Sequence, residues 1–130
     1  MNPTDCQKAT PFFKFENLRL YHKSLTFSIA ILAVYDRTSS ESDKHVVKRL
    51  LDTAMMITNH IIEGSSATKN AFITCLQQAK GCIKECVAYT ALLHDRKVID
   101  EEQTDDIRNE LIELTKMAGA LIVSLQGETN

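Results

Sequence analysis

Apolar residues recur every three or four positions along four long stretches of the chain, which is the spacing of one face of an α-helix. The four stretches run from about Leu18 to Arg37, Asp43 to Glu63, Thr68 to His94 and Glu101 to Gln126. Four helices of this length joined by short turns must alternate in direction. The pattern therefore predicts an all-α protein, an up-down-up-down antiparallel four-helix bundle.

Polar residues and glycines mark the ends of these stretches. Ser40 with Asp43 and Asp100 with Gln103 resemble capping boxes, and Thr68 is a candidate N-cap. We interpret two glycines, Gly64 and Gly127, as residues that end the second and fourth helices. The predicted organisation is an N-terminal arm over residues 1–16, a bundle over residues 17–127 and a tail over residues 128–130.

The first predicted helix has one apolar stripe, widened by two further isoleucines. The stripe consists of Leu18, Tyr21, Leu25, Leu32 and Tyr35, with Ser28 between them and with Ile29 and Ile31 alongside. We predict that it faces the core.

The second predicted helix has two stripes side by side. The first stripe is Val47, Leu50, Ala54, Ile57 and Ile61, and the second is Val46, Leu51, Met55 and Ile62. A helix that is apolar over so wide a face is buried on two sides. We therefore predict a homo-oligomer, with Leu51, Met55 and Ile62 as the candidate oligomer face.

The last two predicted helices each carry one core stripe. The third contains Phe72, Cys75, Ala79, Cys82, Cys86, Tyr89 and Leu93, and the fourth contains Ile107, Leu111, Leu114, Ala118, Leu121 and Leu125. Gly81 lies in the middle of the third helix, where a glycine costs about 1 kcal/mol relative to alanine. This cost suggests that another helix approaches closely there.

Charge is unevenly distributed, although the net charge of the 130 residues is only -2. Residues 8–49 contain eight Lys/Arg and four Asp/Glu, and residues 95–116 contain eight Asp/Glu and four Lys/Arg. A candidate nucleic-acid stripe follows the basic half: Lys14, Arg19, Lys23, Arg37, Lys44, Lys48 and Arg49. Its cations would contact phosphates, and Phe12, Phe13 and Phe15 would stack on bases. For a single copy, a solvated face with the aromatic arm packed on the bundle is the favoured alternative.

No known catalytic constellation is recognisable, and we expect neither enzymatic activity nor a cofactor. Cys82 and Cys86 share a helix face that His60 could approach, which is the basis of a metal-site alternative. Free cysteines more often serve as small apolar fillers of a core, and we favour that interpretation. The chain shows no signal peptide and no apolar run of membrane-spanning length, so we expect no membrane partner, a cytoplasmic location and reduced thiols.

Three motifs occur in a characteristic order: FENLRLYHKS at Phe15–Ser24, IIEGSS at Ile61–Ser66 and QAKGCIKE at Gln78–Glu85. Together they resemble the bacterial four-helix bundle proteins named for 23S rRNA intervening sequences, over nearly the whole chain. The residues that match this family's signature are Glu63, Gly64, Ala79, Gly81 and Glu85. His60 and Cys82 depart from the pattern, since the family usually has Asn and Ser there.

The resemblance implies a cytoplasmic four-helix bundle without enzymatic activity. Some relatives assemble as barrel-like homopentamers. A related protein, the accessory variability protein of diversity-generating retroelements, is strongly basic and binds nucleic acid and a reverse transcriptase, whereas this chain is not basic overall. The leading hypothesis is thus a non-enzymatic homo-oligomer, pentameric by resemblance, that works by assembling and binding. The alternative is an accessory protein that binds RNA or DNA through the basic stripe.

Overall fold

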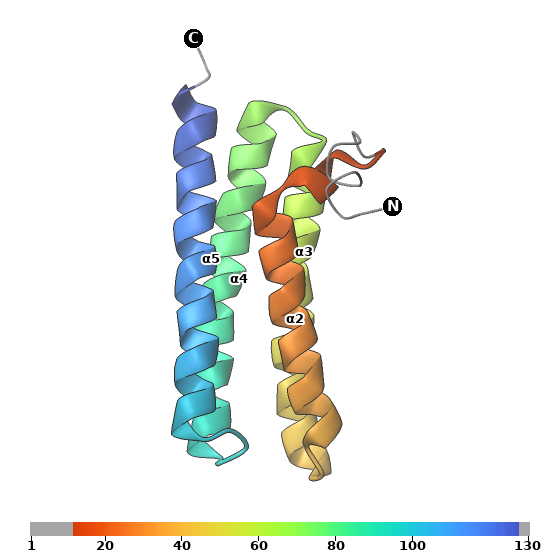
Figure 1. Ribbon diagram of the computed structural model, residues 1–130, viewed down its shortest axis with the longest axis vertical. Coiled ribbons are helices and arrows are strands. Elements are labelled where there is room, and N and C mark those ends of the chain that lie inside the picture. The colour runs from red at the N-terminus through yellow and green to blue at the C-terminus, as the bar shows by residue number, and fades with distance from the viewer. Residues whose placement is uncertain (1–11, 128–130) are drawn as a thin grey trace, which may run out of the picture.

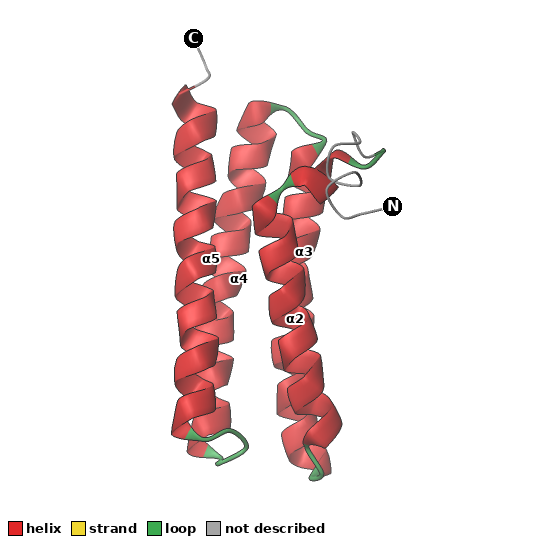
Figure 2. Ribbon diagram, viewed as in Figure 1, coloured by secondary structure: helices red, strands yellow, loops and turns green. Residues whose placement is uncertain are grey.

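The protein was examined as a computed structural model, which describes residues 12–127. Residues 1–11 of the predicted arm and the predicted tail at 128–130 lie outside the described residues. The elements are a short 3₁₀ helix η1 (Lys14–Asn17) and the α-helices α2 (Arg19–Arg37), α3 (Glu41–Ser65), α4 (Lys69–Asp95) and α5 (Glu101–Gly127). Figures 1 and 2 show the four long helices side by side, joined by short turns.

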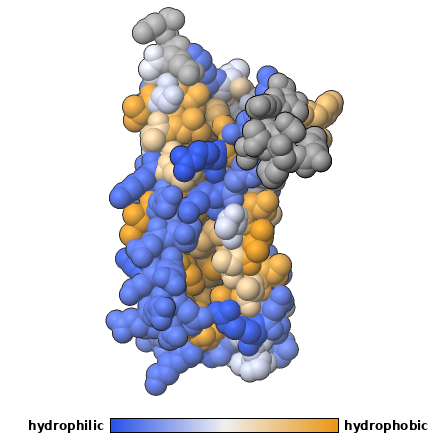
Figure 3. Space-filling model, viewed as in Figure 1, coloured by the Kyte–Doolittle hydropathy of each residue, from blue (hydrophilic) through white to orange (hydrophobic). Residues whose placement is uncertain are grey.

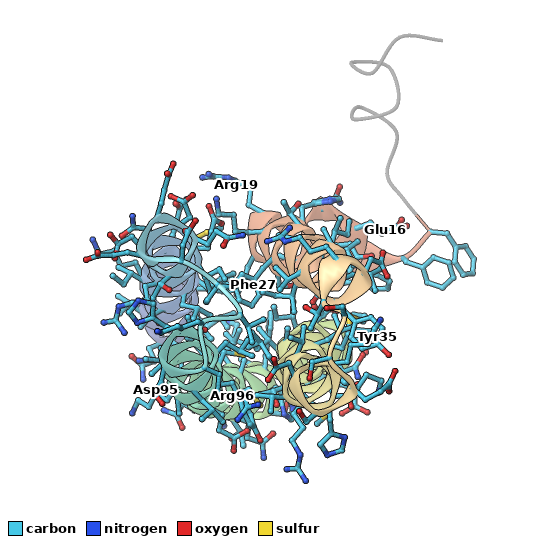
Figure 4. All side chains as sticks on the ribbon, turned by 90° about the horizontal axis from the view of Figure 1, so that it is seen from below. Glu16, Arg19, Phe27, Tyr35, Asp95 and Arg96 are labelled. Atoms are coloured by element: carbon cyan, nitrogen blue, oxygen red, sulfur yellow. The ribbon has the colours of Figure 1, made fainter. Side chains whose placement is uncertain are left out.

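Helices that follow one another in the sequence are also neighbours in space. α2 packs on α3, α3 on α4 and α4 on α5, while α2 and α5 close the bundle through the sparsest contact of the four. The end-on view in Figure 4 shows the four helices surrounding one core. The predicted all-α, up-down four-helix bundle is confirmed.

Side-chain caps start three of the four long helices, as predicted. Ser40 Oγ accepts from the amide of Asp43 (3.4 Å), and Thr68 Oγ1 accepts from the amide of Ala71 (3.3 Å). Before α5 the capping box is reciprocal. The amide of Gln103 donates to the Asp100 carboxylate (2.8 Å), and the amide of Asp100 donates to Gln103 Oε1 (2.9 Å). These bonds satisfy amides that have no partner within their own helix.

The helix ends agree only in part with the prediction. Gly64 does not end α3, because the helix continues to Ser65 and none of the described glycines has a positive φ. Gly127 is the last residue of α5, as predicted. The left-handed residue is Lys97, at φ 62°, after α4. Its amide donates to His94 O and the amide of Val98 donates to Leu93 O, both at 3.0 Å, which is a Schellman ending without glycine.

The core contains the predicted stripe of α3 and part of the predicted stripe of α2. Val47, Leu50, Ala54, Ile57 and Ile61 are all buried, as expected. On α2, Ser28 and Ile31 are buried as predicted, but most of the buried face consists of residues that the predicted stripe left out: Leu20, Ser24, Phe27 and Val34. The predicted members Leu18, Tyr21 and Tyr35 are half-buried and pack against the core. Ile29 is 61% exposed and Leu32 44%.

The stripes of α4 and α5 are confirmed for most of their members. In these two helices the predicted residues that are buried are Phe72, Ala79, Cys86, Leu93, Ile107, Leu111, Leu114 and Ala118. The predicted members Cys75, Cys82, Tyr89, Leu121 and Leu125 are half-buried. Within residues 12–127, no helix combines the length and the hydropathy that a bilayer span requires.

Candidate functional site: an apolar outer face on α2 and α3

Two contacts fix how α2 and α3 lie against each other. Ser24 Oγ and Thr58 Oγ1 share a buried hydrogen bond of 2.9 Å. At the lower end of the pair, the Lys44 ammonium lies 3.9 Å from the centre of the Tyr35 ring. The flank of α2 that carries Tyr35 and the flank of α3 that carries Lys44 and Thr58 therefore meet at one seam.

Apolar residues that are exposed or only half-buried line both sides of this seam. Leu25, Ile29 and Leu32 follow at helical spacing on α2, and Leu51, Met55 and Ile62 do so on α3. We call these six residues the outer face. Figure 3 shows hydrophobic surface gathered along α2, whereas the lower half of α5 is mostly hydrophilic. Three residues of the stripe predicted for the core of α2, Leu25, Ile29 and Leu32, thus belong to this outer face.

The outer face is partly open to solvent. Ile29, Leu32 and Met55 are exposed, with Met55 at 36%, whereas Leu51 and Ile62 are half-buried and Leu51 also packs against the core. Single exposed apolar residues are ordinary, but a contiguous apolar patch is typical of a surface that binds another molecule. Two of the three predicted oligomer-face residues, Leu51 and Ile62, therefore also contribute to the folded monomer.

An aromatic cluster continues the outer face at its upper end. The Phe15 ring packs edge-on against Tyr21 at 4.8 Å, and η1 contacts both α2 and α3. His22 Nε2 forms a 2.6 Å hydrogen bond with the backbone oxygen of Glu16, which holds η1 on α2. Phe12 and Phe13 lie beyond this anchor, 92% and 55% exposed. The arm therefore packs on the bundle through Phe15, while Phe12 and Phe13 extend into solvent.

The structure does not bring the seven residues of the candidate nucleic-acid stripe together. Lys14 and Arg19 lie near the start of α2, whereas Arg37, Lys44, Lys48 and Arg49 lie near the turn between α2 and α3. Lys23 lies between these groups and pairs with Glu110 (3.1 Å) and Glu113 (3.5 Å) of α5. Its hydrogen bond to Glu110 raises the pKa of Lys23.

We call Arg37, Lys44, Lys48 and Arg49 the lower basic group. Two of its members, Lys48 and Arg49, border a groove between α3 and α4. The residues that line it are His45, Lys48, Arg49, Asp52, Thr53 and Tyr89. Asp52 neutralises part of its charge, because Lys48 Nζ donates to both Asp52 carboxylate oxygens at 2.8 Å. Arg49 and His45 are exposed along the same groove.

The five signature residues divide into packed and exposed positions. Gly64 is buried where α3 meets α4, and a Cβ added there would lie 2.5 Å from a ring carbon of Phe72. Ala79 is also buried, whereas Glu63, Gly81 and Glu85 are exposed. The close approach predicted at Gly81 is wrong, because an added Cβ would meet nothing within 4 Å. The contact lies at Gly64 instead, where the helices converge at their shared turn.

Two cysteines of α4, Cys82 and Cys86, are in surroundings that disfavour the thiolate form. Burial, with smaller effects from Cys82 and Glu85, raises the pKa of Cys86 to about 12. Burial also raises the pKa of Cys82, with Glu85 adding to the shift. Among residues 12–127, no three His, Cys, Asp or Glu side chains are arranged to hold a metal ion. Cys86 is thus a core filler, the interpretation favoured from the sequence.

These observations define the class: an antiparallel four-helix bundle with an unfilled apolar outer face. The chain belongs to the 23S rRNA-intervening sequence protein family, whose sequence model matches residues 16–120. This range includes all five signature residues, so the resemblance of the three motifs is confirmed. Comparisons with curated proteins and with solved structures gave no match.

Proposed function

We propose that this protein is a non-enzymatic assembly protein, which forms a homo-oligomer by burying the outer face of α2 and α3 between copies. The observation that carries the proposal is the convergence of two surplus apolar stripes, one from each helix, on a single side of the bundle. Complete burial of a Leu, Ile or Met side chain contributes about 1.5–3 kcal/mol. Ile29, Leu32 and Met55 are exposed in one copy, so much of this free energy would be gained only when a second copy buries them.

A ring of five copies is the assembly that the family resemblance favours. A ring requires a heterologous interface, in which two different surfaces of one chain meet. The acidic first half of α5, with Glu101, Glu102, Asp105 and Asp106, supplies a surface opposite in charge to the basic groups of α2 and α3. Such exposed pairs contribute little affinity each but help to fix the register between copies.

The experiment that tests this proposal is a charge substitution on the outer face. Ile29→Glu and Met55→Glu affect exposed side chains, so both variants are expected to fold. Light scattering on the size-exclusion peak should show that each variant has lost most of its assembled form. Leu51→Glu and Ile62→Glu should also dissociate the assembly, but they are less suitable because both residues are half-buried in the monomer.

The matched control is Ile112→Glu on α5. Ile112 is 47% exposed, close to the exposure of Leu32, but lies on another helix and outside the outer face. It should leave the assembled mass unchanged. An assembled mass that survives both outer-face substitutions would show that the interface lies elsewhere.

A second candidate function is nucleic-acid binding by the lower basic group. The observation in its favour is that Lys48, Arg49 and Tyr89 line one groove, which combines cations with an aromatic side chain. A ring would repeat this groove in every copy, and phosphate contacts add. Affinity for single-stranded RNA should then fall steeply as salt is raised, and salt-independent binding would exclude this mode.

A further inference from the structure

A hollow lies between α2 and α5, at the end of the bundle where α2 begins. Arg19 and Leu20 of α2 and the preceding residue Leu18 line it on one side, and Met117, Ala120 and Leu121 of α5 line it on the other. We call this hollow, of about 320 Å³, the α2–α5 groove. It occurs at the seam where the two helices make their sparsest contact, so the groove is an apolar concavity that the bundle itself leaves open.

The same chain carries two exposed aromatic residues, Phe12 and Phe13, which we call the projection. They are apolar, like most of the lining of the groove. The rings of Phe12 and Phe13 pack edge-on at 5.0 Å, and Phe13 packs on Phe15 at 5.8 Å. The aromatic chain from Phe12 through Phe15 to Tyr21 is therefore anchored at one end and exposed at the other. The anchor at Phe15 reduces the conformational freedom that the neighbouring aromatic pair would lose on binding.

The projection and the groove of one chain lie on different sides of α2. η1 packs against α2 and α3, and in the part of the chain that the structure describes it makes no comparable contact with α5. Figure 4 shows Glu16 of η1 on the side of α2 turned away from α5, whereas Arg19 lies on the α5 side. Phe12 and Phe13 therefore cannot fill the groove of their own chain in this arrangement, but those of a second copy can.

Projection and groove also lie at the same height along the bundle. Leu18 lines the groove and directly follows η1, which positions Phe13. Two complementary surfaces at equal height on different sides of one subunit can be brought together by rotation about an axis parallel to the helices. Repetition of that rotation gives a ring if it closes.

The surface below the groove also suits a second copy. Thr26, Ala30 and Ala33 follow Lys23 at spacings of three and four on the α5 side of α2, and all three are exposed. Their small side chains permit close approach of a bulky face. The outer face lies below Phe12 and Phe13 in the same way. When Phe12 and Phe13 of one copy meet the α2–α5 groove of a second copy, the outer face of the first copy can therefore meet Thr26, Ala30 and Ala33 of the second.

We propose that Phe12 and Phe13 of one copy dock in the α2–α5 groove of a second copy. This inference rests on the proposed homo-oligomer and names the two surfaces that meet in it. The groove is the receptor, and its partner is the aromatic arm of an identical chain.

Disulfide crosslinking between separately labelled copies tests this docking. In the full chain, Cys6, Cys75 and Cys82 are replaced by serine and the buried Cys86 is kept. One preparation then carries Phe13→Cys and the other Ala120→Cys. After mixing and mild oxidation, a covalent dimer should form at least tenfold more than with the control preparation, which carries Gln78→Cys on the exposed side of α4 instead of Ala120→Cys.

Light scattering on the same samples separates the two levels of the proposal. Several copies per particle together with the dimer support the docking. If the particles contain several copies but the dimer yield equals that of the control, the docking is overturned and the homo-oligomer still stands. The same conclusion follows if a variant that carries both Phe13→Cys and Ala120→Cys forms its disulfide only within one chain. Monomeric particles overturn both. Independently, Phe12→Ser with Phe13→Ser should raise the concentration at which the assembly dissociates at least tenfold, and an unchanged midpoint overturns the docking.

Discussion

Gly64 of α3 faces the ring of Phe72 of α4 at such close range that a Cβ on Gly64 would lie 2.5 Å from Phe72 Cδ1 and 3.0 Å from Cys75 Cβ. Cys75 Cβ is fixed to the α4 backbone and the Phe72 ring is buried, so the added Cβ would force the ring or the helices to shift. Gly64→Ala should therefore lower the free energy of unfolding by about 1–3 kcal/mol, the usual cost of overpacking. Urea unfolding measures this change.

Gly81→Ala is the control, and its predicted effect has the opposite sign. Gly81 lies in the middle of α4, exposed, with nothing within 4 Å of an added Cβ. The alanine should stabilise the protein by about 0.5–1 kcal/mol, because glycine is the poorer helix former. If the two substitutions had equal effects, the packing role assigned to Gly64 would be wrong.

Ser24 and Ser28 are buried one turn apart on α2 but differ in their hydrogen bonds. Ser24 Oγ bonds to Tyr21 O and to Thr58 Oγ1, whereas Ser28 Oγ has no partner among the described residues. Ser28→Ala should raise the free energy of unfolding by up to about 1 kcal/mol, while Ser24→Ala should lower it by about 1–2 kcal/mol. A destabilised Ser28→Ala protein would indicate a partner for Ser28 that the described residues do not include.

Cys86 makes the stability of the bundle sensitive to alkaline pH. Its pKa is raised from 9.0 to about 12 on folding, mainly by burial. The unfolded chain therefore loses this proton first, so the contribution of Cys86 to stability is complete below about pH 9 and is lost as the pH rises toward 12. Between pH 8 and 10.5, unfolding free energies of the wild type and of Cys86→Ala should converge by an amount on the order of 1–2 kcal/mol. A constant difference would contradict the assigned environment of Cys86.

Substitutions in the groove between α3 and α4 test the second candidate function, nucleic-acid binding, separately from assembly. If the groove binds single-stranded RNA, Lys48→Ala combined with Arg49→Ala should weaken binding at least tenfold and reduce its salt dependence. Lys84→Ala combined with Lys116→Ala removes the same charge elsewhere and should change binding much less. Fluorescence anisotropy with a labelled oligonucleotide at several salt concentrations makes the comparison.

Most of the fold could be predicted because helix starts and core periodicity are local properties. The caps at Ser40, Thr68 and Asp100 placed three helix starts within two residues. The phase of α2 was not predictable in the same way, since this helix is apolar on both its core side and its outer side. The more continuous run, through Leu25 and Leu32, proved to be the outer one, while two serines lie in the core.

Helix packing was harder to predict because it depends on neighbours that no local pattern identifies. Gly64 and Gly81 both lie inside helices, yet of these two only Gly64 is in close contact with a neighbouring helix, α4. Charge poses the same problem. Lys23 belongs to a basic run in the sequence but pairs with Glu110 and Glu113 on the neighbouring helix α5. Neither partner could be inferred from residues near Lys23 in the chain.

The central claim is that copies of this chain assemble through the outer face. Its most direct test is light scattering on the size-exclusion peak of the unmodified protein, with absorbance recorded at 260 and 280 nm. The chain has no Trp and three Tyr, so bound nucleic acid would dominate the absorbance. We predict a mass of several times 14.6 kDa, with five copies favoured by the family resemblance. A clean peak of 14.6 kDa at micromolar concentration would contradict the claim and leave Ile29, Leu32 and Met55 exposed without a partner.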